Sequence, residues 1–111
     1  MVADQLADED WDRLFHALAD TTRRDIVVQV MRQGQSISTL AGRYEMSFAA
    51  VQKHVAVLER AGLVRKERRG REQHVHGEPL VLHRAARLLD SYELLQRHRT
   101  SAIEALLEED P

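Results

Sequence analysis

Hydrophobic residues recur at helical spacing in the first third of the chain. In "EDWDRLFHAL" they occupy positions i, i+3, i+4 and i+7, and the first turn is acidic, as the helix macrodipole favours. In "TTRRDIVVQVMRQG" they form a second stripe, for which Asp20 is a suitable N-cap and Gly34 a suitable stop. The pattern predicts two consecutive amphipathic helices.

Two further helices are predicted with a very short connection between them. The segment "QSISTLAGRYEM" indicates a short helix capped by Ser36 or Ser38. The segment "MSFAAVQKHVAVLERAG" indicates a longer helix that is capped by Ser47 and ended by Gly62. Two short helices joined so tightly, the second rich in alanine, are typical of a helix-turn-helix, which we expect over residues 36–61.

The periodicity changes after the alanine-rich helix. The runs "LVRKERR" and "EQHVHG" flank Gly70–Arg71, and glycine permits a tight reversal, so residues 63–77 are predicted to form a two-stranded β-hairpin. The many cations make both faces of this hairpin too polar for a central sheet. We therefore expect it to project into solvent as a wing.

The last segment predicts one long helix that begins at Pro79, with a bend or break near Asp90–Ser91. Its apolar face is too long for the core of one small subunit to cover. We therefore expect helices at about 8–18 and 79–109 to pair with a second copy of the chain in a homodimer. The residues expected in this interface are Trp11, Phe15, Leu88, Tyr92, Leu95, Ile103 and Leu106.

Composition and charge narrow the function. The chain has 111 residues, which is enough for one domain, and we expect a single domain over residues 1–111. Its net charge is −2. The charge is segregated: residues 1–20 hold six acids and one arginine, whereas residues 64–71 hold five cations and one acid. Such a local positive potential suits a polyanion. The chain has no cysteine, signal pattern or apolar run of the ~18–20 residues that span a bilayer, so we expect a cytoplasmic protein without a membrane partner.

Three segments carry a family resemblance. The chain resembles the ArsR/SmtB family of dimeric bacterial transcriptional regulators in the segments "LADTTRRDIV", "TLAGRYEMSFAAVQKHVAVLERAGLV" and "RRGREQHV". The resemblance covers nearly the whole chain and is most specific from Ser47 to Val64. The resemblance implies a mainly α fold with a two-stranded β wing, that is, a winged helix-turn-helix that dimerises through its terminal helices. It also implies a repressor, often autoregulatory, that binds an inverted repeat in double-stranded DNA.

The helix that begins after Ser47 would then be the recognition helix. Gln52 can bond adenine, Lys53 can bond guanine or a phosphate, and the wing cations can neutralise phosphates. His54 neighbours the buried stripe, and it can pack, bond a phosphate or read a base. The residues expected to bind DNA are Ser47, Phe48, Ala49, Gln52, Lys53, His54, Arg68, Arg69 and Arg71. Arg23 and Arg24 suit phosphate contacts, interdomain contacts or ion pairs with the acidic N-terminal segment.

Metal sensing is a separate question in this family. Serines stand at the positions of the family's cysteine pair, and Tyr92 stands where a terminal-helix site would need histidine, so the chain is more similar to the non-metal branch. His74 and His76 remain as an alternative zinc or nickel pair on one side of a strand. No cofactor is expected, and the effector is not indicated. A protein–protein adaptor is a further alternative, whereas no motif indicates an enzyme.

Overall fold

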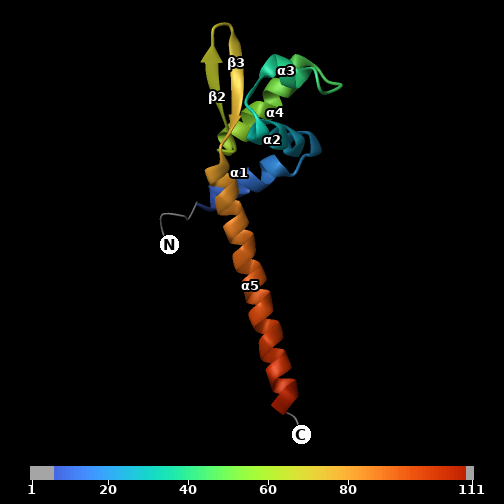
Figure 1. Cartoon of the computed structure of the whole chain (residues 1–111), viewed down its shortest axis with the longest axis vertical. Helices are drawn as coiled ribbons and strands as arrows, with labels where there is room; N and C mark the ends of the chain where they lie inside the picture. The colour runs from blue at the N-terminus through green and yellow to red at the C-terminus, as the bar shows by residue number, and fades with distance from the viewer. Residues whose placement is uncertain (1–6, 110–111) are drawn as a thin grey trace. The chain divides into compact units, whose positions relative to one another are not determined.

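The computed structural model describes residues 7–109 of the chain. The chain divides into two compact units, residues 1–81 and residues 82–111. The elements, in chain order, are α1 (Asp8–Leu18), α2 (Thr21–Arg32), β1 (Gln35–Ser36), α3 (Ile37–Ala41), α4 (Phe48–Arg60), β2 (Val64–Arg69), β3 (Glu72–Gly77) and α5 (Pro79–Glu109) (Figure 1). The mainly helical fold with a β wing is thus confirmed.

The first unit is built around side chains that α1 to α4 and the sheet contribute. The most deeply buried are Leu14, Ile26, Leu40, Val51, Val55, Leu58, Leu63 and Val75. Full burial of one such side chain stabilises a fold by about 1.5–3 kcal/mol. Because both helices of the helix-turn-helix and the root of the wing share this core, their relative placement within the unit is fixed by packing.

The helix ends were largely predictable because local groups determine them. Side chains of Asp20, Ser36 and Ser47 accept hydrogen bonds from the backbone N–H three residues later, at 3.0, 3.0 and 3.1 Å. Gly62 ends α4 with φ +77°, and the N–H of Leu63 donates to the carbonyl of Leu58 at 3.0 Å, which makes a Schellman motif.

The sheet has three antiparallel strands in the order β1-β3-β2, one more than predicted. The hairpin of β2 and β3 turns on Gly70, whose φ is +62°, while Arg71 has a negative φ, the pattern of a type II′ turn. In the first unit the hairpin lies beside α3 and α4, which contact β3 and β2, and its turn lies beyond them (Figure 1). The short strand β1 adds to β3, where Gln35 pairs with Val75 and Ser36 with His74.

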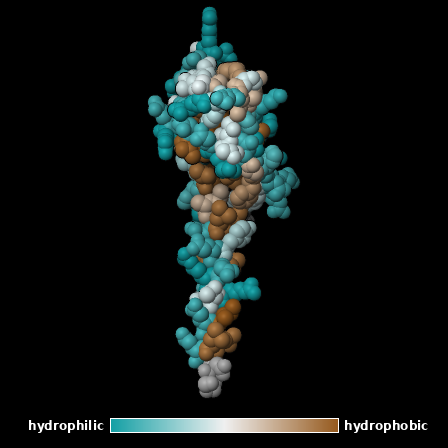
Figure 2. Space-filling view, turned by 90° about the vertical axis from the view of Figure 1, so that its right-hand side faces the viewer, coloured by the Kyte–Doolittle hydropathy of each residue, from teal (hydrophilic) through white to brown (hydrophobic). Residues whose placement is uncertain are grey.

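Helix α5 is continuous over its 31 residues, a length of about 46 Å at 1.5 Å per residue. The predicted break near Asp90–Ser91 was therefore wrong: the hydroxyl of Ser91 donates to the carbonyl of Leu88 at 2.6 Å without interrupting the helix. Large apolar side chains remain exposed along α5, and Figure 2 shows such hydrophobic surface among polar groups. No helix in the described residues is long and apolar enough to span a membrane.

Candidate nucleic-acid interface

Helix α4 has one buried face and one open face. Val51, Val55 and Leu58 are fully buried, as predicted. On the other side Phe48, Ala49, Gln52 and Lys53 are exposed, and Phe48 retains 47% of its accessible surface. Within residues 7–109, neither Gln52 nor Lys53 has a hydrogen-bond or ion-pair partner. Their polar ends are therefore available to an external ligand.

His54 differs from the other predicted α4 residues because it faces protein. Its Nδ1 atom lies 3.3 Å from Nη1 of Arg23 and 3.9 Å from Oδ2 of Asp20, and its side chain is mostly covered. The backbone N–H of Arg23 holds the pKa of the Asp20 carboxyl below its usual range, and the charges of Arg23 and His54 act in the same direction. Thus His54 links α4 to the start of α2 and does not extend outward.

Arg23 and Arg24 bind the backbone carbonyls at the end of α1, a contact that none of their three expected roles included. The Nε and Nη2 atoms of Arg23 donate to the carbonyls of Ala17 and His16 at 2.8 and 3.0 Å. Nη1 of Arg24 donates to the carbonyl of Leu18 at 2.8 Å. The last carbonyls of a helix lack partners within the helix, and cations there are favoured by the macrodipole.

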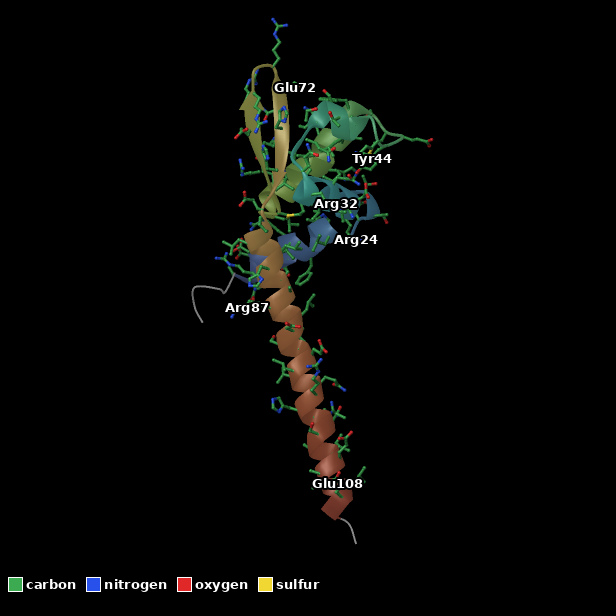
Figure 3. All side chains as sticks on the ribbon, in the orientation of Figure 1. Arg24, Arg32, Tyr44, Glu72, Arg87 and Glu108 are labelled. Atoms are coloured by element: carbon green, nitrogen blue, oxygen red, sulfur yellow. The ribbon has the colours of Figure 1, made fainter. Side chains whose placement is uncertain are left out.

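Tyr44 ties the turn of the helix-turn-helix to α2. It lies beyond the end of α3, in the connection to α4, and its hydroxyl donates to Oδ2 of Asp25 at 2.6 Å. Figure 3 shows its position beside the α3–α4 connection. Burial raises the pKa of the Tyr44 phenol, and the hydrogen bond to Asp25 adds to this effect, so the hydroxyl remains a donor.

The cations of the wing divide into paired and unpaired sets. Arg65 donates to Glu78 at 2.9 Å, Lys66 lies 3.4 Å from Glu59, and Arg69 donates to Glu67 at 2.6 Å. By contrast, Nε of Arg68 donates to the carbonyl of Gly70 at 3.2 Å, and no ion pair of Arg68 or Arg71 is found in the described part of the chain. The unpaired positive charge therefore lies at the tip of the hairpin.

The two strand histidines lie on the same face of the sheet, as their spacing predicted. Each is next to a different carboxylate: His74 is 3.5 Å from Glu72, and His76 is 3.7 Å from Glu67. Across residues 7–109, no three histidine or acidic side chains are grouped so that they could hold a metal ion. The pair thus lacks the third protein ligand that a tight zinc site requires.

Comparisons with known proteins agree with this geometry. Residues 20–66 match the family described as bacterial regulatory protein, arsR family. The structure of an ArsR-like transcriptional regulator from Rhodococcus sp. RHA1 is 32% identical, with a TM-score of 0.83 over 93% of this chain and 94% of that one. The chain belongs to the arsR family. This arsR-family chain is a transcriptional regulator with a winged helix-turn-helix DNA-binding fold.

Two further solved structures are similar in fold. One described as a possible transcriptional regulator for arsenical resistance is 31% identical, with a TM-score of 0.68 over 82% of this chain and 94% of that one. The solution structure of a homodimeric winged helix-turn-helix DNA-binding domain from Mycobacterium bovis is 21% identical, with a TM-score of 0.63 over 80% and 90% of the two chains. A search of curated proteins found no similar sequence.

Sequence reasoning missed two features of the site. The first is the contact of Arg23 with α4 through His54. The second is Glu67, which bonds Arg69 from within the basic strand. A signal for the second was available, because residues two apart on a strand share a face, so Glu67 had to lie beside Arg65 and Arg69.

Proposed function

We propose that this arsR-family regulator is a cytoplasmic repressor that acts as a homodimer on an inverted-repeat operator in double-stranded DNA. It is not an enzyme in this proposal and requires no cofactor or metal. The observation that carries the proposal is the open face of α4, whose polar side chains have no partner in the described residues, in the same compact unit as a hairpin with a cationic tip.

The roles of the two parts differ. The major groove of DNA admits a helix, and the first turns of α4 present Phe48, Ala49, Gln52 and Lys53 for contact with base edges. Arg68 and Arg71 at the wing tip would bind phosphates, which adds affinity and register but little sequence choice. Ser47 caps the helix and can also contact a phosphate. His54 would act indirectly, by fixing α4 against α2.

Support for a homodimer comes from apolar surface on the terminal helices. In α5, Tyr92, Leu95, Ile103 and Leu106 are between 49% and 68% exposed, and in α1 Phe15 is 39% exposed and stacks with Trp11. So much apolar surface favours contact with a second copy. Two recognition helices related by a two-fold axis would occupy half-sites about 34 Å apart, and the operator would therefore be an inverted repeat.

DNA binding can be tested by selecting genomic fragments with the purified protein and measuring their affinity by fluorescence anisotropy. We expect the double variant Gln52→Ala, Lys53→Ala to lose preference for selected over shuffled fragments. Arg71→Ala should weaken both fragments alike and reduce the salt slope by about one. Arg32→Gln, which removes an exposed cation from α2, is the matched control and should change neither. Absence of any selected fragment would refute the proposal.

Dimerisation can be tested separately by sedimentation equilibrium. Leu95→Lys places a charge in the apolar stripe of α5 and should shift the protein toward monomer. Ser101→Lys introduces the same charge on the opposite side of the same helix and should leave the association unchanged. If the wild-type protein is a monomer at micromolar concentration, or if the two variants behave alike, the proposed interface is wrong.

A further inference from the structure

We propose that Glu67 is a built-in competitor for DNA phosphates, which holds Arg69 in the free protein and so limits the affinity of the wing for DNA of any sequence. The inference rests on the proposed function, because it requires that the wing bind phosphates. It concerns a residue that would not itself contact DNA.

The geometry places Glu67 at the centre of a charged cluster on one face of β2. Its Oε1 atom accepts a hydrogen bond from Nε of Arg69 at 2.6 Å, and its Oε2 atom lies 3.8 Å from Nη1 of Arg65. Nε2 of His76, across the strand pair, lies 3.7 Å from Oε1. The hydrogen bond from Arg69 holds the pKa of Glu67 below its usual range, so the carboxylate is charged throughout the neutral range.

A phosphate can replace this carboxylate because the guanidinium fork binds both groups in the same way. The pair is open to water: the side chains of Arg69 and Glu67 are 57% and 42% exposed. Ion pairs at such sites are held weakly and exchange partners readily. Arg69 can therefore pass from Glu67 to a phosphate, but the freed carboxylate would then repel the same backbone.

Arg65 is more firmly retained than Arg69. It donates to Glu78 at 2.9 Å and lies farther from Glu67. Arg68 and Arg71, in contrast, have no carboxylate partner among the described residues. The wing therefore offers two arginines directly and a third only in competition with Glu67.

The functional consequence concerns binding to non-operator DNA. Phosphate contacts supply most of non-specific affinity, whereas base contacts from α4 supply sequence choice. A carboxylate that weakens one phosphate contact weakens all sequences alike. It thereby reduces the fraction of the regulator held on the large excess of non-operator DNA.

The test is a pair of double-mutant cycles measured on a selected and a shuffled fragment over a salt series. Glu67→Gln should raise affinity for both fragments by up to about five-fold at low salt. It should also steepen the salt slope by up to about one. In an Arg69→Ala background the same change should have almost no effect. Glu45→Gln is the control, because it removes one exposed carboxylate outside the wing that has no ion pair with an arginine among the described residues, and its small effect should be equal in both backgrounds.

Two results would overturn the proposal while DNA binding itself stands. If Glu67→Gln raises affinity equally with and without Arg69, the carboxylate acts only through the net charge of the wing. If Glu67→Gln lowers affinity, Glu67 positions Arg69 for DNA and does not compete for it. If the wild-type protein binds no fragment at all, the proposed function fails and this inference fails with it. Far-UV circular dichroism of each variant checks that the fold is retained.

Discussion

Gly34 lies where the end of α2 meets β1, and alanine at this position should destabilise the protein. A Cβ atom on Gly34 would lie 2.6 Å from Cε1 of His76 and closer still to Nδ1. The φ angle of Gly34 is not positive, so the backbone itself accepts alanine. The expected penalty of Gly34→Ala in the folded state is therefore steric, and the nearest atoms all belong to the side chain of His76 in β3.

The size of the effect follows from how far His76 can move. Its backbone is fixed by pairing with Arg65, and its ring is largely covered, with Nε2 buried. Overpacking of this kind destabilises by about 1–3 kcal/mol, and the loss of glycine's freedom in the unfolded chain offsets about 0.4–1 kcal/mol. The net loss is then between about 0 and 2.6 kcal/mol, and its midpoint of about 1.3 kcal/mol lowers the melting temperature of a chain of this size by about 5–10 °C.

Thermal unfolding followed by far-UV circular dichroism, at one fixed protomer concentration, measures this change. Gly42→Ala is the matched control, because Gly42 is in the right-handed helical region and a Cβ there would make only an ordinary contact, 3.5 Å from the carbonyl of Thr39. It should stabilise by about 0.4–1 kcal/mol. Removing the ring with His76→Ala should cancel most of the Gly34→Ala penalty in a double-mutant cycle. Equal stabilisation by both glycine variants, or no coupling to His76, would refute the reasoning.

Three shorter predictions concern the helix-turn-helix. Asp20→Asn keeps the N-cap but removes a carboxylate whose pKa is lowered on folding. The wild-type protein should therefore be more stable than this variant above the unfolded pKa of about 3.9. In urea titrations at a series of pH values, the difference should vanish as the pH falls through the lower pKa of the folded state. Tyr44→Phe removes the hydrogen bond to Asp25 and should lower stability by about 1 kcal/mol in urea unfolding. Phe48 is exposed where thymine methyl groups could meet it, so fragments amplified with uracil in place of thymine should bind the wild-type protein more weakly but Phe48→Ala equally well, as measured by anisotropy.

The parts of the fold that were predictable depend on neighbours in sequence. Asp20 and Ser47 cap their helices because their side chains reach a backbone N–H three residues ahead, and Gly62 ends α4 because it adopts a left-handed conformation. Strand β1 was missed because two residues carry no periodicity, and its pairing with β3 joins positions about forty residues apart. Gly34 was predicted as a helix stop, but its main constraint is the close approach of His76.

The outward face of α4 was predictable for a similar reason. A buried stripe at helical spacing determines which side of the helix remains open, and Gln52 and Lys53 follow from it. His54 does not, because its orientation depends on Arg23, thirty-one residues earlier. The role of Arg23 in turn depends on the carbonyls at the end of α1, which no pattern of side chains reveals.

The wing shows why local charge is an incomplete guide to a binding surface. Within residues 64–71 five cations face one acid, which suggests a uniformly basic strand. The fold brings two more acids to the base of the hairpin, Glu59 from α4 and Glu78 from the segment before α5, and these pair with Lys66 and Arg65. Positive charge is therefore neutralised where the hairpin joins the core, whereas Arg68 and Arg71 near the tip have no ion pair among the described residues. A projecting hairpin meets a neighbouring molecule first at its tip, so the charge remains where a DNA backbone would reach it.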